Sequence, residues 1–425
     1  MSHNGLDIVF VNPPFWGCSE SPLYGCLWLS SYLRDLGYAV DYVDGEVLNV
    51  DHRQLAKIVA GKKPRVVGVS ATSLNINSAE RLIAELKKQA DATIVLGGVH
   101  VTALEGAESY GADIVVVGEG FVPLERILEG SRDPIQHGSA VDLDGLPLPA
   151  WDLVDLHDYL GNFPRLAQPS TTTFTSIGCP HRCSFCSLLY KTPRFRNPEI
   201  VCDELELLEK KGAREVFFYD DEFNLNRRHA HAVCSEIIDR GLNERLSFKS
   251  QMRASRRNTT EDLLKHMKEA GFTILMWGLE SGSQRVLDEG IKKNLSVEDA
   301  EWSLRTAHEV GLINYGFLMV QNIGETWEEV LQTASFLKCV KSYLPYSQVT
   351  IATPYPGSEL YDRAGEGGWI KNPQTIKDTY HPLMDTPWMT AEEALKAKDL
   401  LDSILKGRIW MLRRRVRRWV KKYES

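Results

Sequence analysis

The sequence lacks the marks of a secreted or membrane-spanning protein. It has no apolar stretch of signal-peptide type near its first residues and no hydrophobic run long enough to cross a bilayer. Eight cysteines are few for a disulfide framework in 425 residues, and five of them stand at no paired spacing. No repeat period is visible. These absences argue against secreted, membrane-embedded and solenoid proteins, and we expect a reduced, cytoplasmic protein.

The composition is that of an ordinary globular protein. Hydrophobic residues make up 43% of the chain and charged residues 25%. A length of 425 residues predicts two or three domains with substantial cores. From the pattern of apolar runs and prolines we expect an N-terminal domain over residues 1–149, a linker over 150–169, a central domain over 170–361 and a C-terminal helical region over 362–425. In the proline-rich linker, Trp151 is expected to pack between the two domains.

Three of the cysteines stand close together. Cys179, Cys183 and Cys186 have a CxxxCxxC spacing, on a loop after the strand-like run Thr172–Ile177. Three thiolates on so short a segment can converge on one soft metal centre. A structural zinc or a closed iron–sulfur cluster needs a fourth ligand, so three thiolates alone leave one position open to a small molecule. A zinc site completed by His181 or by a distant residue is the alternative.

This spacing, with the aromatic Phe185 directly before the third cysteine, resembles the radical S-adenosylmethionine (SAM) superfamily. The resemblance implies a [4Fe-4S] cluster on the three cysteines, with one open iron that binds the amino and carboxylate groups of SAM. It also implies that an electron from the cluster cleaves SAM to a 5′-deoxyadenosyl radical. The backbone of Phe185 is then expected to contact the adenine.

Short apolar runs alternate with helical segments in the N-terminal domain. This alternation predicts an α/β fold with a doubly wound, flavodoxin-like parallel sheet, which binds ligands beyond the carboxyl ends of its strands. The five expected strands are Ile8–Val11, Val40–Val43, Val66–Ser70, Thr93–Leu96 and Ile114–Val117. Several residues that follow these strands are small, which lets a bulky ligand approach the backbone. The candidate ligand residues are Pro13, Pro14, Ser70, Thr72, Gly97, Gly98, His100, Glu119 and Gly120.

A flavodoxin-like domain directly before such a core resembles the cobalamin-dependent radical SAM family. Ser70-x-Thr72 and Gly97-Gly98 look like the Ser-x-Leu and Gly-Gly signature of cobalamin domains, with threonine in place of leucine. The resemblance implies that cobalamin binds at the candidate residues of this domain. A domain for another ligand, or one that only supports the central domain, is the alternative.

The histidine that holds cobalt from below in many cobalamin enzymes has no counterpart here. The Asp-x-His-x-x-Gly motif is absent, and the corresponding loop reads Asn12-Pro13-Pro14-Phe15-Trp16-Gly17. Cobalt would therefore lack a histidine ligand from that loop. His100 lies near the expected site, and its alternative role is that of a hydrogen-bonded loop residue.

The central domain contains six strand-like runs that alternate with helices. They are Thr172–Ile177, Glu215–Tyr219, Leu246–Gln251, Ile274–Gly278, Asn314–Val320 and Ser347–Ile351. This order predicts a partial (β/α)6 barrel with its polar residues at the carboxyl ends of the strands. Together with the first domain it predicts a cobalamin-binding sheet, then a radical SAM barrel, then a C-terminal helical region.

Polar residues follow strand after strand of this barrel, and each suits one group of SAM. Asp220 and Asp221 are placed for the amino group, and Arg253 suits the carboxylate in a forked geometry. Glu280 and Ser281 lie in a Gly-x-Glu-Ser-Gly-Ser run that resembles the family's and are placed for the ribose or the carboxylate. The alternative for each residue taken singly is a structural role, as a surface acid, a surface base or a helix cap. Relatives commonly carry Gly-x-Pro-Gly-Glu-Thr after the fifth strand, whereas this chain has Gln-Asn-Ile-Gly-Glu-Thr over 321–326.

The last twenty residues are strongly basic. Residues 406–425 hold nine bases and one acid, a net charge of +8 in a chain whose total is −8, so residues 1–405 carry about −16. Their apolar residues recur at helical spacing, which predicts a basic amphipathic helix. Such a helix suits an anionic membrane surface on the inner face of the membrane, an acidic carrier or RNA. Docking on the acidic body of the same chain is the alternative.

The resemblance implies a cobalamin-dependent radical SAM methyltransferase that acts on an unactivated carbon, or on phosphorus. Such a centre is not nucleophilic, so ordinary displacement on SAM fails. The expected cofactors are a [4Fe-4S] cluster, SAM and cobalamin. The expected partners are a small-molecule or lipid-like substrate and an electron donor of flavodoxin or ferredoxin type, with no nucleic acid.

Three alternatives stay open. One is a non-methylating enzyme on the same scaffold, such as an oxidative cyclase or a ring-rearranging enzyme. Another is a methylthiotransferase, which is disfavoured because no second cysteine triplet precedes the core. The third is a non-catalytic iron–sulfur or cobalamin sensor with a tail that binds nucleic acid.

Overall fold

The structure is a computed structural model that describes residues 5–15, 19–187, 189–371 and 378–405. The basic tail over 406–425 and part of the loop after the first strand, residues 16 and 17, lie outside the described residues. The chain divides into two compact units, residues 1–175 with 194–217, and residues 176–193 with 218–425. The domain boundaries expected from the sequence stay predictions.

The first unit holds a six-stranded parallel sheet in the order β2-β1-β3-β4-β5-β6. The five expected strands are present, and a sixth was missed. Only Gln136 is buried in β6, so that edge strand has no apolar run to reveal it. The strands are β1 (Ile8–Asn12), β2 (Val40–Asp44), β3 (Val66–Ser70), β4 (Thr93–Gly97), β5 (Ile114–Gly118) and β6 (Ile135–Gly138).

Helices cover this sheet because its strands are apolar on both faces. All five residues of β1 are buried, as expected for a central parallel strand. Helices α3 and α4 pack together, and so do α1 and α6. The helices of the unit are α1 (Tyr24–Asp35), α2 (Gly45–Leu48), α3 (His52–Gly61), α4 (Ile76–Gln89), α5 (Val99–Ala103), α6 (Phe121–Leu128) and α7 (Pro198–Lys210).

A second six-stranded sheet has the order β14-β13-β12-β11-β10-β7, so its strands follow one another in chain order. The pairings from β11 to β14 are parallel. This is the expected partial (β/α)6 arrangement. The strands are β7 (Ser170–Thr173), β10 (Glu215–Phe218), β11 (Ser247–Met252), β12 (Phe272–Glu280), β13 (Ile313–Val320) and β14 (Tyr346–Ile351).

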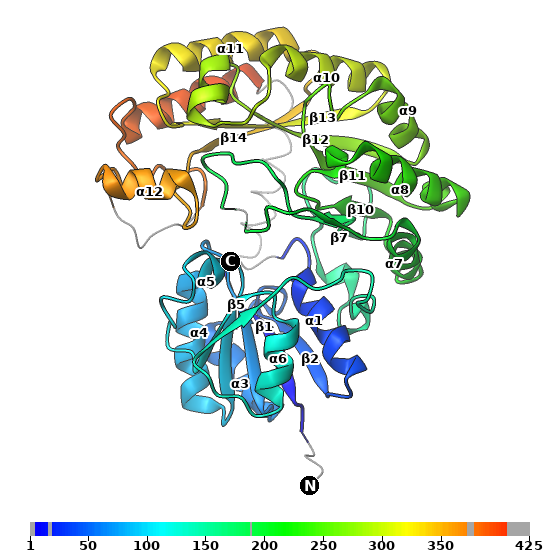
Figure 1. The fold of residues 1–425 in the computed structure, drawn as a ribbon, viewed down its shortest axis with the longest axis vertical. Coiled ribbons are helices and arrows are strands. Elements are labelled where there is room, and N and C mark those ends of the chain that lie inside the picture. The colour runs from blue at the N-terminus through cyan, green and yellow to red at the C-terminus, as the bar shows by residue number, and fades with distance from the viewer. Residues whose placement is uncertain (1–4, 16–18, 188, 372–377, 406–425) are drawn as a thin grey trace. The chain divides into compact units, whose positions relative to one another are not determined.

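The helices of the second unit form a layer along strands β11 to β14 (Figure 1). Several of them begin at a side-chain cap; Asn226, Thr260 and Ser296, for example, each accept a hydrogen bond from a first-turn backbone N–H. These caps fix the loops that carry the candidate site. The helices are α8 (Arg227–Asp239), α9 (Glu261–Glu269), α10 (Val297–Glu309), α11 (Trp327–Val340), α12 (Glu359–Glu366) and a last helix over 391–405.

The run Thr172–Ile177 was expected to be one strand, and this was wrong. Strand β7 ends at Thr173, and the separate strand β8 (Ser176–Ile177) pairs with β9 (Arg194–Phe195) in a two-stranded sheet. The apolar pattern runs through both pieces because both are buried or half-buried. The break lets β8 and β9 flank the loop that carries the three cysteines.

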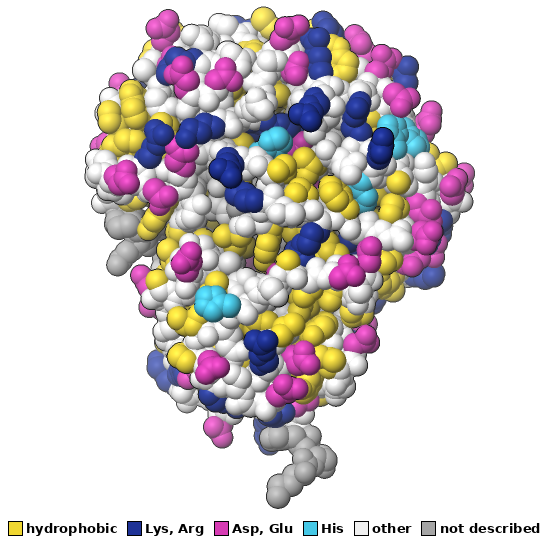
Figure 2. Space-filling view, viewed as in Figure 1, with side chains coloured by type: hydrophobic (Ala, Val, Ile, Leu, Met, Phe, Trp, Pro, Cys, Tyr) yellow, Lys and Arg dark blue, Asp and Glu magenta, His cyan; other side chains and the backbone are white. Residues whose placement is uncertain are grey.

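Among the described residues, the structure contains no helix that is long and apolar enough to span a membrane. Figure 2 shows acidic and basic side chains interspersed over the face in view. The strongly basic segment of the sequence, residues 406–425, is not among the residues described.

Candidate active site at the strand ends of the second sheet

The cysteine loop is held at its base by backbone contacts. Gly178 has φ +100°, and a Cβ there would lie 2.9 Å from the carbonyl oxygens of Tyr190 and Thr192, so only glycine fits. The Gly178 N–H donates to the Asp221 carboxylate at 2.8 Å, and the Cys179 N–H donates to the Tyr190 carbonyl at 3.0 Å. These contacts hold the base of the loop in place.

The middle of the loop rests on an apolar wall. Cys183 packs against Val286, Leu287 and Ile291, of which the first two belong to the π-helical turn η5 (Val286–Gly290). The Ser184 N–H donates to the Ile291 carbonyl at 2.8 Å. All three cysteines of the loop are half-buried, and none of them forms a disulfide. Three thiols on one anchored loop, one of them against apolar side chains, fit a cluster that must be shielded from water.

The protonation of the first cysteine depends on its surroundings. Burial raises the pKa of the Cys179 thiol to about 11, and the negative charges of Glu222 and Asp221 add to the shift. The thiol is therefore protonated near neutral pH unless a cation lies beside it. A bound metal supplies that cation and deprotonates the thiol.

Glu222 is a site residue that the sequence interpretation missed. Its Oε2 lies 3.3 Å from His181 Nε2 and 4.0 Å from Cys179 Sγ, and its Oε1 accepts a hydrogen bond from Asn258 at 3.0 Å. Ligand atoms of Cys179, His181 and Glu222 all lie within 4.8 Å of one another. The only sequence signal was its place directly after Asp220-Asp221.

The two preceding acids, in contrast, accept hydrogen bonds from residues at the base of the cysteine loop. Asp220 is fully buried and accepts a hydrogen bond from the Ser176 hydroxyl at 2.6 Å. Asp221 accepts the Gly178 N–H described above. Their assignment to the SAM amino group stays a prediction.

The next strand ends bring Arg253, Glu280 and Lys293 together. The Lys293 ammonium lies 2.8 Å from Glu280 Oε1, and the Arg253 guanidinium donates to the backbone carbonyls of Lys293 and Asn294. All three side chains are buried. The sequence named Arg253 and Glu280 but not Lys293, which follows a turn far from any strand end.

Ser281 and Phe185, which the sequence also named for SAM, contact other side chains of the protein. The Ser281 hydroxyl lies 3.1 Å from that of Thr333 and accepts the Ser283 N–H. Phe185 packs against an apolar cluster that includes Met319 and Ile323. The unusual loop after β13 contributes directly to that cluster through Ile323.

The other substituted residues of that loop bind backbone groups. Gln321 donates from its amide to the carbonyls of Met384 and Met389, at 2.9 and 3.2 Å. Asn322 donates from its backbone and its side chain to Glu325, both at 3.0 Å. Burial raises the pKa of Glu325 to about 7. The departure from the family's usual residues thus ties the loop to the segment before the last helix.

In the first unit, the candidate ligand residues lie at the carboxyl edge of the sheet. Strand β1 lies between β2 and β3, so the strand order changes direction between β1 and β3, the place where sheets of this kind bind ligands. Pro13 and Pro14 follow β1, and Ser70 ends β3. Gly98 has φ +102°, and a Cβ there would lie 2.4 Å from the Ala71 carbonyl oxygen. Only glycine fits at this position, because the turn after β4 passes directly against the backbone that follows β3.

Several residues named for this edge also have protein partners. His100 is buried, with Nδ1 2.9 Å from the Ser73 hydroxyl and Nε2 2.8 Å from the Tyr110 hydroxyl. Both ring nitrogens are thus hydrogen-bonded, as the loop-residue alternative requires. Thr72 donates from its N–H and its hydroxyl to Asn75.

The remaining candidates surround the end of β5. Glu119 pairs with Arg194 and accepts the Val141 N–H at 2.8 Å. Gly120 directly precedes α6. Gly97 ends β4. Their contact with cobalamin stays a prediction.

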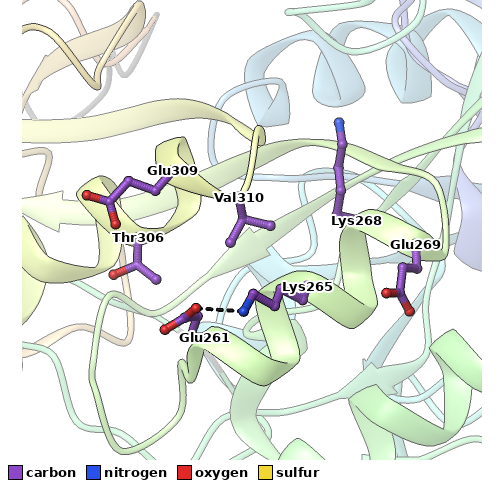
Figure 3. Close-up of a pocket in the computed structure, with 7 residues that line it drawn as sticks. All are labelled: Glu261, Lys265, Lys268, Glu269, Thr306, Glu309 and Val310. Atoms are coloured by element: carbon purple, nitrogen blue, oxygen red, sulfur yellow. Dashed lines mark ion pairs between the residues drawn. The ribbon is translucent and has the colours of Figure 1, made fainter.

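A pocket of about 280 Å³ opens between α9 and α10 (Figure 3). Its acidic and basic lining residues include the Glu261–Lys265 ion pair at 2.7 Å. No cysteine or histidine is among the residues that line it. It lies between two helices of the helical layer and shares no lining residue with the cysteine loop.

Comparison with known proteins agrees with this geometry. The model of the Radical SAM superfamily matches residues 173–337, which contain the three cysteines, and the model of the B12 binding domain matches residues 19–128. The chain therefore contains a radical SAM domain. A B12-binding domain precedes its radical SAM core, so the predicted family, fold class and cofactor set are confirmed.

Two relatives extend over most of the chain. An "Uncharacterized methyltransferase PH0819" of Pyrococcus horikoshii is 29% identical, over 92% of this chain and 90% of the relative. An "Anaerobic magnesium-protoporphyrin IX monomethyl ester cyclase" of Cereibacter sphaeroides is 26% identical, over 94% of this chain and 69% of the relative.

A solved structure shares the fold. It is the radical SAM methyltransferase TsrM of Kitasatospora setae with cobalamin and a [4Fe-4S] cluster bound. The TM-score is 0.71 at 17% identity, over 94% of this chain and 89% of that one. This likeness supports the order of a B12-binding domain and a radical SAM core.

Proposed function

We propose that this radical SAM enzyme transfers a methyl group to a carbon or phosphorus atom that is not activated as a nucleophile. The observation that carries the proposal is the presence, in one chain, of a B12-binding domain and a radical SAM core whose loop offers three thiols. The methyltransferase relative that aligns along 92% of the chain supports it.

Residues of the second unit would hold the cluster and SAM. Cys179, Cys183 and Cys186 would bind the cluster. A bound cluster supplies the electron that cleaves SAM, and bound cobalamin carries the methyl group. Glu222 would bind the SAM ammonium, because its carboxylate lies beside Cys179. Asp221 orients the cysteine loop through the Gly178 N–H.

The same proposal includes the finer expectations of the sequence. Cobalamin would bind at the carboxyl edge of the first sheet, and the substrate would be a small or lipid-like molecule. Two further parts of the proposal rest on the sequence alone. One is an electron donor of flavodoxin or ferredoxin type, and the other is a contact of residues 406–425 with an anionic membrane surface.

Methyl transfer can be tested without knowing the substrate. The anaerobically reconstituted enzyme is incubated with hydroxocobalamin, a reductant and SAM that carries a deuterated methyl group. We expect mass spectrometry to find the labelled methyl group on cobalamin and S-adenosylhomocysteine as the co-product. Bound cobalamin that stays unlabelled would favour the non-methylating alternative, for which the cyclase relative is the supporting observation.

The role of Glu222 can be tested through SAM affinity. Glu222→Gln keeps the shape of the side chain and removes its charge, so the ammonium loses a charge-assisted hydrogen bond worth about 1.5–3 kcal/mol. We expect the Kd for SAM, measured by equilibrium dialysis, to rise about tenfold or more. Glu298→Gln is the matched control, since Glu298 is 81% exposed and pairs only at the surface with Arg256. An unchanged Kd in Glu222→Gln would remove Glu222 from the SAM site.

A further inference from the structure

Two adjacent lysines after η5 have opposite surroundings. The Lys292 side chain is 44% exposed and pairs with Glu359. The Lys293 side chain is only 9% exposed, with its ammonium 2.8 Å from Glu280 Oε1. A buried ammonium costs several kcal/mol unless it is paired, and the pair itself gains little over apolar packing. Lys293 therefore occupies a position that stability alone does not explain.

Lys293 lies next to the wall on which the cysteine loop rests. Its N–H donates to the carbonyl of Leu287 at 2.8 Å, and Leu287 packs against Cys183. Burial by itself would lower the pKa of Lys293, but the pKa is raised, chiefly by the paired Glu280 carboxylate. The ammonium is thus charged, and its partner is Glu280 Oε1 at 2.8 Å.

The charged groups of this buried set can be counted. Arg253 donates to the carbonyl of Lys293, and its charge opposes that of Lys293. The set therefore contains two cations, Arg253 and Lys293, and one carboxylate, Glu280. These three side chains together therefore carry one net positive charge.

The backbone around the set is held in an unusual conformation. Glu280, Lys292 and Asn294 all have positive φ, at +60°, +58° and +54°. Such conformations are unfavourable for residues other than glycine and persist only where the surroundings impose them. They occur at Glu280 and on both sides of Lys293, the two residues of the buried pair.

We propose that Lys293 is a positioning residue whose buried charge stabilises the reduced form of the cluster bound at Cys183. The inference rests on the proposed function, because it requires that cluster. One-electron reduction by an external reductant adds one negative charge beside Cys183. In a buried site a nearby cation lowers the energy of that charge far more than it would in water. Lys293 therefore raises the reduction potential, and Glu280 lowers it.

The test is a redox titration of the reconstituted cluster without SAM. Electron paramagnetic resonance measures the amount of reduced cluster at each potential. At the potential that half-reduces the wild-type cluster, we expect Lys293→Met to lower the ratio of reduced to oxidised cluster about tenfold, or about 59 mV. Lys293→Arg keeps the charge and should stay within about twofold. Lys292→Met is the matched control, because it removes the same charge one residue away at the surface, and it should also stay within about twofold.

A second variant keeps the test decisive if Lys293→Met does not fold or takes up no iron. Glu280→Gln removes the opposing charge and should raise the ratio, whereas a merely structural pair would lower cluster content without moving the potential. If the ratio of reduced to oxidised cluster is unchanged in Lys293→Met or in Glu280→Gln, the inference is wrong, but the proposed function still stands. A wild-type enzyme that takes up no [4Fe-4S] cluster overturns the proposed function, and the inference with it.

Discussion

Cys183→Ala is expected to abolish the formation of 5′-deoxyadenosine from SAM. The loop offers three thiols, and the loss of one leaves the cluster without the ligand that packs against Val286, Leu287 and Ile291. We expect a rate at least about 10³-fold lower, equivalent to about 4 kcal/mol of activation free energy. The measurement is anaerobic turnover with a reductant, with iron and sulfide analysed on the same sample.

The control removes a thiol elsewhere. Cys339 is an exposed free cysteine on α11, and Cys339→Ala should keep both its iron and its activity. Full metal content in Cys183→Ala would point instead to the group formed by Cys179, His181 and Glu222. In that case His181→Ala, and not Cys183→Ala, would release the metal, as the zinc alternative requires.

Glu204→Gln is expected to lower the free energy of unfolding by about 3–5 kcal/mol. Glu204 is fully buried on α7, and its Oε2 lies 2.7 Å from the guanidinium of Arg196, which is also buried. The Tyr24 hydroxyl and the Trp151 indole N–H donate to the same carboxylate, each at 3.0 Å. The substitution leaves the Arg196 charge buried without its counter-ion. Urea denaturation of the cofactor-free protein, followed by tryptophan fluorescence, measures the change.

Two further variants separate charge from packing. Glu206→Gln on the same helix removes an acid that pairs with Lys210 only at 3.9 Å, and it should change the unfolding free energy by less than about 0.5 kcal/mol. The double variant Arg196→Met with Glu204→Leu removes both charges and should recover most of the loss. A double variant no more stable than Glu204→Gln would show that the hydrogen bonds of Tyr24 and Trp151, and not the ion pair, dominate.

This network also shows how the proline-rich connector is fixed. Trp151 was expected to pack between the two domains drawn from the sequence. In the structure it is buried, lies edge-on to Tyr24 of α1 at 5.9 Å and donates to Glu204 of α7. It therefore joins α1 to α7 within the first unit, and its packing between the two expected domains stays a prediction. The hydrogen bond that selects tryptophan there could not be read from the sequence, because Glu204 lies 53 residues further along the chain.

The two wrong predictions of strands from the sequence concern an edge strand and a junction between two strands. Strand β6 has a polar pattern with one buried residue, so it lacks the apolar run that marks the central strands. The junction of β7 and β8 was read as one strand because burial continues across the break. In both places hydrophobicity reports burial, and only the pairing of distant strands decides where an element begins and ends.

The sequence by itself determined the chemistry of the cysteine loop and the succession of strands and helices. The spacing of ligands within eight residues and the apolar runs are local properties, so both can be recognised in the sequence before the fold is known. The tertiary structure decided which polar side chain faces the loop. Among the three acids after β10 it brings Glu222 to Cys179, whereas Asp220 accepts the Ser176 hydroxyl and Asp221 accepts the Gly178 N–H. Only the three-dimensional path of the turn after η5 brings Lys293 to Glu280, because a side chain's direction depends on backbone angles that distant packing imposes.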